Sequence, residues 1–215
     1  MVGQGVLREC LLDPGVEAVR VVGRSPLNQK HEKLTELVMQ DVGNLAPVYG
    51  ELTGYDACFF PLGVSSGGMT ESAYRKLTYD LTLAIARPLA ELNPGMTFIY
   101  VSGAGTDSTE HGSVMWARIK GATENALLKL PFKAVYLFRP GIIQPLHGIR
   151  SKTKAYRLLY SLLGFLMPAL RALFPRHVTT TEEVGRAMIE VARNGGPQPV
   201  MEIRDIIRQG RQNES

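Results

Sequence analysis

Short apolar runs alternate with amphipathic helical segments along most of this chain, and that alternation limits its possible folds more than any other feature. Strands are expected where the runs are rich in β-branched and aromatic residues, at 18–22, 37–39, 57–60, 97–101, 134–138 and 200–203. Helices are expected at 2–11, from a Thr70 cap to about 92, at 114–130 and at 181–193, with Pro88 kinking or ending the second. Because apolar strands alternate with helices, the pattern predicts an α/β fold with a doubly wound parallel sheet.

One domain covering 1–215 accounts for the length, and a composition with 45% hydrophobic and 20% charged residues is that of an ordinary globular protein. The net charge of +4 comes without interleaved aromatic and basic motifs, so a small molecule is expected as partner and nucleic acid is not. Cys10 and Cys58 lie far apart in apolar stretches and form neither a metal-binding pair nor a disulfide framework. Since the first residues lack signal-peptide features, a cytoplasmic protein without a metal site is expected.

Loops rich in Gly, Ser or Arg follow most of the expected strands. Ligands of an open parallel sheet bind outside the carboxyl ends of the strands. The candidate loops therefore begin at Gly23, Asp41, Gly63, Ser102 and Arg139. Such loops let backbone N–H groups approach a phosphate or ribose closely, which favours a nucleotide site.

The loop after the first expected strand reads Gly23-Arg24-Ser25 and contains no acidic residue. A site for NAD usually offers Asp or Glu there to hold the ribose 2′-hydroxyl, whereas a guanidinium suits a 2′-phosphate. Arg24 therefore favours NADP over NAD. The alternative is that Arg24 is a solvated surface residue.

Several segments resemble landmarks of the extended and atypical short-chain dehydrogenase/reductases. Residues 1–6 resemble the end of the G-x-x-G-x-x-G turn between the first strand and helix, with Gly3 as the third glycine, and 100–105, 139–141 and 181–185 resemble later motifs. The nearest branch is epimerase/dehydratase-like, among bacterial relatives of the Tat-interacting-protein-like oxidoreductases. The resemblance spans nearly the whole chain and implies a Rossmann-type domain. The cofactor-binding residues that follow from it are Gly3, Arg24, Asp41, Leu62, Gly63, Lys120, Arg139 and Pro140.

Two departures from that family matter. The first strand and the first two glycines of the turn are missing before Gly3, so neighbouring strands are expected to keep unpaired edges. The expected explanation is a start codon assigned too late; a truncated form that is unstable or does not bind is the alternative. The family's Y-x-x-x-K pair reads Trp116-Ala117-Arg118-Ile119-Lys120 here, which keeps the lysine and loses the tyrosine.

The resemblance implies that Lys120 holds the nicotinamide ribose and that Ser102 orients a carbonyl, so these two are the predicted catalytic residues. Trp116 has no ionisable proton, and with Ser65 it is placed on the substrate side. A proton would have to come from water or from another loop residue, each of which is otherwise an ordinary exposed side chain. The candidates are Asp107, Ser108, Glu110, His111 and His147.

An apolar segment of 17 residues, Leu158–Phe174, carries Pro168 and Arg171 and is short of the roughly 20 residues of a membrane span. A helical, substrate-side lid over about 142–180 or a dimer face is expected, and peripheral contact with an anionic membrane is the alternative. An apolar lid indicates an apolar substrate. Two functions stay open: an NADP-dependent oxidoreductase for an apolar carbonyl or alcohol, and a non-catalytic NADP-binding sensor or interaction protein.

Overall fold

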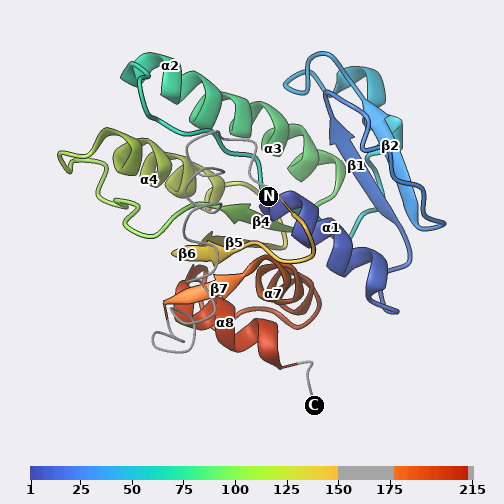
Figure 1. The fold of residues 1–215 in the computed structure, drawn as a ribbon. Helices are drawn as coiled ribbons and strands as arrows, with labels where there is room; N and C mark the ends of the chain where they lie inside the picture. Colours follow the sequence, from blue (N-terminus) through green and yellow to red (C-terminus); the bar gives the residue numbers. More distant parts are fainter. Residues whose placement is uncertain (150–176, 213–215) are drawn as a thin grey trace.

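A computed structural model describes residues 1–149 and 177–212, and every strand pair within them is parallel (Figure 1). The central sheet has the order β3-β4-β5-β8, and the pairs β1-β2 and β6-β7 stand apart from it. The strands are β1 (Val19–Gly23), β2 (Leu34–Val38), β3 (Ala57–Phe60), β4 (Thr97–Val101), β5 (Ala134–Arg139), β6 (Ile142–Gln144), β7 (Val178–Thr180) and β8 (Val200–Glu202).

The helices begin at polar caps that the sequence provides. Thr70 accepts a hydrogen bond from the Ala73 N–H at the start of α2, and Thr180 and Glu183 form a capping box on α7. The helices are α1 (Val2–Leu12), the 3₁₀ turn η1 (Ala46–Glu51), α2 (Glu71–Arg75), the π-helical η2 (Lys76–Asp80), α3 (Leu81–Leu92), α4 (Met115–Leu127), α7 (Thr181–Asn194) and α8 (Ile203–Arg211).

Both faces of the central sheet are covered, as the alternating side chains of β4 show. Ile99 and Val101 pack into a core cluster with residues of α1, α7 and α8, while Phe98 and Tyr100 point to the other face, into a cluster with residues of α3 and α4. Figure 1 shows these two helix layers on opposite sides of the sheet. The prediction of an α/β fold with a doubly wound parallel sheet is confirmed.

Two glycines bring α1 against α7. A Cβ on Gly5 would lie 2.6 Å from the Thr181 carbonyl oxygen, and one on Gly185 would lie 2.7 Å from Glu9 Cγ. Glu9 is buried there and accepts a hydrogen bond of 3.2 Å from Arg186 Nε. The contact fixes α1 on the sheet, with its first turn toward the carboxyl ends of the strands.

The parallel sheet is interrupted between β1 and β3. In the described part of the chain, β1 pairs with β2 alone and β3 with β4 alone. Val19 of β1 and Phe59 of β3 both pack on the core cluster that contains Val6 and Cys10 of α1, so side chains rather than backbone hydrogen bonds join the two parts. A further strand at this interruption stays a prediction.

The structure differs from the predicted elements in several places. β2 begins at Leu34, three residues before the predicted strand. Pro88 does not end α3, which continues to Leu92 because Leu89 and Ala90 beyond it are buried. The ends of the predicted helical segment 142–180 are the paired strands β6 and β7. α8 was not predicted, because Ile206 and Ile207 are the only large apolar residues among its buried positions and the rest of the stretch is mostly polar or charged.

The apolar segment Leu158–Phe174 lies outside the described residues. Across 1–149 and 177–212, no helix combines the length and the apolar character that a membrane crossing requires.

Candidate functional site

The first turn of α1 lies at the carboxyl end of β3. A Cβ on Gly3 would approach Pro61 Cγ to 3.1 Å, so Gly3 packs directly on the residue that follows β3. Leu62 next in the chain is 41% exposed, and Gly63 has open space around its Cα. The N–H groups of a helix's first turn have no partners within the helix and attract anions. This part of the edge therefore provides backbone donors beside an accessible loop.

Arg24 follows β1 directly, and its side chain is exposed. Within residues 1–149 and 177–212, the structure gives its guanidinium no hydrogen bond or ion pair. Asp41 is also exposed, but its Oδ1 accepts a 2.9 Å hydrogen bond from the Gly43 N–H. Ser65 accepts a 3.3 Å bond from the Gly67 N–H. Asp41 and Ser65 thus accept hydrogen bonds from the backbone of their own loops, whereas the Arg24 side chain makes no such bond within the described residues.

Ser102, Trp116 and Lys120 come together at the carboxyl end of β4. Lys120 Nζ donates hydrogen bonds of 3.4 Å to the Val101 carbonyl oxygen and to the Tyr100 hydroxyl. The Trp116 ring lies along the loop that follows Ser102, because a Cβ on Gly105 would sit 3.6 Å from the ring. Trp116 and Lys120 are one turn apart on α4, so the same helix face carries both.

Burial controls the charge of Lys120. Its Nζ lies 5.1 Å from the centre of the Tyr100 ring, and desolvation lowers the pKa of Lys120 to about 8, while Glu124 one turn along α4 acts in the opposite direction. Burial raises the pKa of Tyr100, which is 1% exposed. The Lys120 ammonium can therefore lose a proton near neutral pH, whereas the neighbouring Tyr100 phenol stays protonated.

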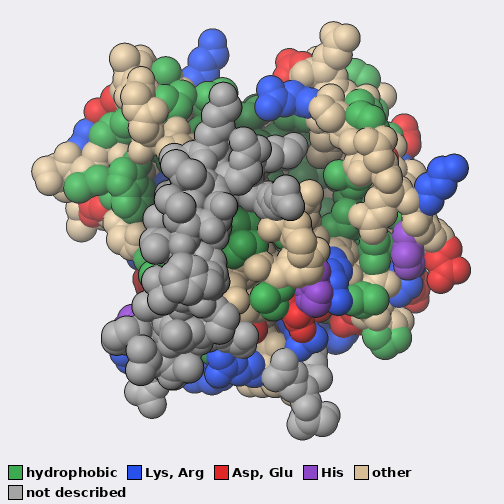
Figure 2. Space-filling view, viewed as in Figure 1, with side chains coloured by type: hydrophobic (Ala, Val, Ile, Leu, Met, Phe, Trp, Pro, Cys, Tyr) green, Lys and Arg blue, Asp and Glu red, His purple; other side chains and the backbone are tan. Residues whose placement is uncertain are grey.

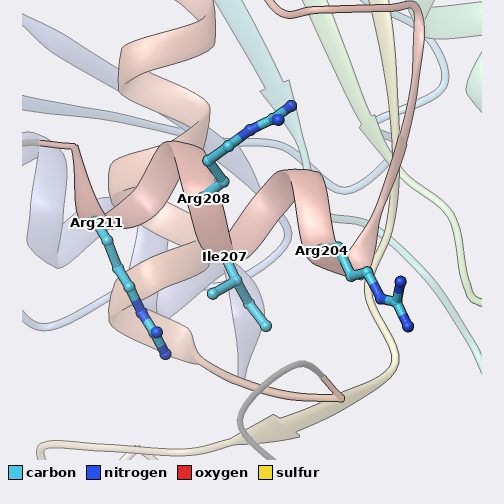
Figure 3. A pocket seen from close by; sticks show the side chains of 4 residues that line it. All are labelled: Arg204, Ile207, Arg208 and Arg211. Atoms are coloured by element: carbon cyan, nitrogen blue, oxygen red, sulfur yellow. The ribbon is translucent and has the colours of Figure 1, made fainter.

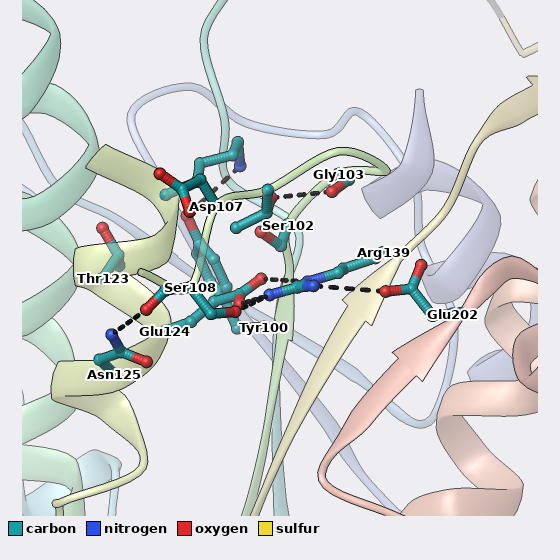
Figure 4. A network of polar contacts seen from close by, with 12 residues as sticks. Tyr100, Ser102, Gly103, Asp107, Ser108, Thr123, Glu124, Asn125, Arg139 and Glu202 are labelled. Carbon is teal, nitrogen blue, oxygen red and sulfur yellow. Dashed lines mark hydrogen bonds and ion pairs between the residues drawn. The ribbon is translucent and has the colours of Figure 1, made fainter. Parts of the chain in front are cut away.

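Ser102 is buried, and its hydroxyl already has a partner in this structure. Its Oγ lies 3.0 Å from Thr106 Oγ1, which donates a 2.8 Å bond to the Gly103 carbonyl oxygen (Figure 4). Because Thr106 uses its hydrogen on Gly103, Ser102 is the donor in the hydroxyl pair. Orienting a carbonyl would require the Ser102 hydroxyl to rotate away from Thr106.

The Arg139 side chain belongs to a buried polar network rather than to the open edge. Its Nε donates 3.0 Å to Glu124, its Nη1 3.3 Å to Glu202 and its Nη2 2.6 Å to the Ser108 hydroxyl (Figure 4). The bonds to Glu124 raise the pKa of Arg139. Nearby, the Pro140 carbonyl oxygen accepts a 3.2 Å bond from the Ala104 N–H. The cofactor roles of Arg139 and Pro140 stay predictions. The Arg139 guanidinium is already paired with Glu124 and Glu202.

The alternative proton donors have other partners. Asp107 accepts 2.6 Å bonds from the Thr109 hydroxyl and the Gly112 N–H, and these bonds lower its pKa. Glu110 accepts from Asn125 at 2.7 Å, and His147 lies 2.9 Å from Glu182. Ser108 is held by Arg139, and His111 is exposed. In the described part of the chain, no hydrogen bond joins any of them to Ser102 or Lys120.

A separate shallow pocket lies on α8, lined by Arg204, Ile207, Arg208 and Arg211 (Figure 3). Arg208 pairs with Asp205 at 3.1 Å and Arg211 with Glu183 at 2.8 Å. None of the predicted site residues lines this pocket.

Tyr100, Thr106 and Glu124 were not identified from the sequence. Strand alternation offered a signal for Tyr100, since it lies two residues before Ser102 and therefore on the same face of β4. Helical spacing offered one for Glu124, which continues the series Trp116, Lys120 at four-residue intervals. Nothing in the sequence marks Thr106, because its role depends on how the loop folds back.

Two fungal proteins resemble this chain in sequence, and no family model matches it. "Protein fmp52-1, mitochondrial" of Aspergillus terreus is 28% identical over 163 residues, which are 72% of this chain and 66%, just under two thirds, of the relative. "Protein fmp52-2, mitochondrial" of the same fungus is 25% identical over 220 residues, 98% of this chain and 93% of the relative. The prediction of a cytoplasmic protein is wrong by this comparison, because these relatives are named as mitochondrial.

Solved structures with the same fold include nucleotide-binding enzymes. The Bordetella bronchiseptica enzyme WbmF in complex with NAD+ superposes with a TM-score of 0.64 at 16% identity, over 98% of this chain and 74% of WbmF. UDP-glucose 4-epimerase of Thermotoga maritima, solved with UDP-glucose, gives 0.64 at 15% identity, over 99% and 79%. The chain therefore shares its α/β fold with these enzymes, and the family branch expected from the sequence stays a prediction.

The buried ion pair generates a stability prediction. Glu124→Gln keeps the shape of the side chain but leaves Arg139 with the more exposed Glu202 as its remaining carboxylate partner, so the free energy of unfolding should fall by about 3 kcal/mol. Urea denaturation measures the change. Glu71→Gln is the matched control, because it removes the exposed partner of Arg118 and should cost less than about 1 kcal/mol. Equal losses in the two variants would contradict the structural role of the buried pair.

Proposed function

We propose that this protein binds NADP(H) at the carboxyl edge of its sheet and is an oxidoreductase for an apolar carbonyl or alcohol. The observation that carries the proposal is the gathering of Ser102, Trp116 and Lys120 at the end of β4. These side chains form a half-buried polar site with a cation and a ring, beside loops accessible to a ligand.

The residues present fit a phosphorylated dinucleotide. The first turn of α1 and the loop at Leu62 and Gly63 would hold the pyrophosphate, and Lys120 would hold the nicotinamide ribose. Arg24 is a charged group at this edge to which the described ranges give no partner, and its guanidinium would bind a 2′-phosphate. Asp41 would contact the adenosine half. Neighbours of the same fold are named with NAD+ or NADH, which supports a nicotinamide dinucleotide. When bound, such a cofactor supplies or accepts a hydride.

The chain's own residues would orient the substrate and exclude water. Ser102 Oγ would donate to the carbonyl oxygen after leaving Thr106, and the Trp116 ring would cover the loop beside it. The proposed apolar substrate is supported by exposed hydrophobic side chains on segments that follow the strand ends: Leu62, Val64, Val114 and Ile142, each between 41% and 51% exposed. Figure 2 shows hydrophobic side chains in a recess near the N-terminal end of α1.

A second function is favoured by Trp116 itself. Tryptophan at the position of the family's tyrosine removes the usual proton donor, and such a protein would bind NADP(H) without reacting. It would then be a sensor or interaction protein, with 158–174 as the segment proposed to contact a partner or a membrane. The same fold hosts both classes, so turnover must decide between them.

Replacing Arg24 tests the cofactor assignment. Arg24→Ser should weaken NADPH binding about tenfold or more, because charge-assisted hydrogen bonds to the 2′-phosphate are lost, and should leave NADH binding unchanged. Fluorescence titration with both nucleotides measures the two dissociation constants. Arg87→Ser is the control, since Arg87 is another exposed arginine without a partner in the described residues. Failure of the native chain to bind either nucleotide would overturn the proposed function.

Replacing Trp116 separates the oxidoreductase from the sensor. Trp116→Tyr should raise the rate of NADPH oxidation with an aromatic aldehyde such as 4-nitrobenzaldehyde, because a phenol would then stand one turn from Lys120. Trp116→Phe is the control that removes the indole without adding a proton donor. If native protein and both variants bind NADPH but oxidise none of it, the sensor is supported.

We also propose that one more parallel strand belongs between β1 and β3. β1 and β3 each have one edge without a paired strand in the described residues, and this supports the proposal, since edge hydrogen-bonding groups of a central sheet are normally satisfied. The DNA sequence before the Met1 codon tests the proposal. An in-frame apolar strand ending in Gly-x-x-Gly would support it, and a stop codon directly before Met1 would contradict it.

A further inference from the structure

We propose that Lys120 itself carries the proton at this site, in the role that position 116 cannot fill. The proposal rests on the function proposed above. In carbonyl reduction, the substrate carbon gains a hydride and its oxygen takes a proton from Lys120 Nζ. One N–H bond breaks as the O–H bond forms, and the neutral amine regains a proton from water.

The position of Nζ suits this role. Its two hydrogen bonds, to the Val101 carbonyl oxygen and to the Tyr100 hydroxyl, are both 3.4 Å long, so they hold the ammonium weakly at the end of β4. An ammonium has three N–H groups, which leaves one directed at neither partner and available to the substrate oxygen; the contact with the ribose proposed above would then replace the weak bond to the Val101 carbonyl. Val101 directly precedes Ser102, so the amine and the carbonyl-orienting hydroxyl belong to the same strand end.

No ion pair within the described residues opposes loss of the proton. Glu124 is the acid one turn away on α4, and its two oxygens accept from Arg139. From α2, Tyr74 is a neutral phenol that acts electrostatically on Tyr100, and Glu71 pairs with Arg118 instead. Because no carboxylate binds Lys120, burial dominates its protonation and lowers its pKa to about 8.

The other groups at this strand end are poorer proton donors. Trp116 has no ionisable proton, and the Ser102 hydroxyl does not ionise near neutral pH. Tyr100 is 1% exposed, and burial raises its pKa, so it holds the Lys120 amine in place rather than reaching a substrate. Lys120 is half-buried, and it combines access with a proton that leaves near neutral pH.

Titration of Lys120 without cofactor is the first test. Acetic anhydride modifies neutral amines, so its rate of reaction with each lysine, followed by peptide mass spectrometry across pH, gives a midpoint for each residue. Lys120 should have a midpoint of about 8. Lys129, which is exposed just after α4, is the matched control in the same experiment. A shared midpoint for the two would overturn the proposal.

Tyr100→Phe adds a readout of positioning in the same experiment. The phenol oxygen accepts a bond from the ammonium, which favours the charged form, so its removal should move the Lys120 midpoint below that of the native chain. An unchanged midpoint would overturn the role given to Tyr100.

Lys120→Arg is the second test, because arginine keeps the charge and the donors but does not release a proton below about pH 12. NADPH binding should stay within about tenfold of the native chain, while turnover of 4-nitrobenzaldehyde should fall about 100-fold or more. Native turnover in this direction should decline above pH 8, as the ammonium is lost. Lys129→Arg should change neither quantity.

The outcomes distinguish failure of proton transfer by Lys120 from failure of the proposed NADP(H)-dependent function. A chain that binds neither nucleotide but whose Lys120 titrates near 8 refutes the cofactor assignment, because the amine was measured without cofactor. If the chain binds NADPH, two results would overturn proton transfer by Lys120. One is native turnover in the Lys120→Arg variant, and the other is a native chain that reduces no aldehyde at any pH.

Discussion

The buried contact between Arg139 and Glu124 determines how the rest of the site is arranged. Glu124 is 1% exposed and Arg139 9%, so neither charge could stay in the interior without the other. The pair joins α4 to β5, and the remaining donors of Arg139 reach Ser108 in the loop after β4 and Glu202 at the end of β8. Three strand ends and one helix are therefore fixed to a single guanidinium.

That contact sets the rotation of α4 about its axis. Glu124, Lys120 and Trp116 follow one another at four-residue intervals, so holding Glu124 against β5 turns the other two toward the end of β4. Gly121 lets the loop lie directly on the helix, since a Cβ there would come within 1.8 Å of the Asp107 carbonyl oxygen. Trp116 and Lys120 lie at the end of β4 because their helix has little freedom to roll or move outward.

The sequence predicted the fold well because apolar runs report burial directly. The helices at 2–11, 114–130 and 181–193 and most strands lie within a few residues of their predicted positions. The partners of side chains were less predictable, as Arg139 illustrates: it follows a strand like a ligand-binding residue, yet its charge is used on Glu124, fifteen positions earlier. Short elements such as β6 and β7 also escaped notice, since three residues carry too little periodicity and their pairing depends on tertiary contacts.

The interruption between β1 and β3 affects how parts of the molecule open locally. A continuous ladder would make the sheet open as one unit, whereas β1 and β2 are attached through side-chain packing on α1 and their neighbours. This pair is therefore expected to open separately from the central sheet, so that its amides exchange with solvent while those of β4 and β5 stay protected. Arg24 directly follows β1, whereas Lys120 is hydrogen-bonded to the end of β4. A ligand that contacts both residues would couple the opening of the pair to that of the central sheet.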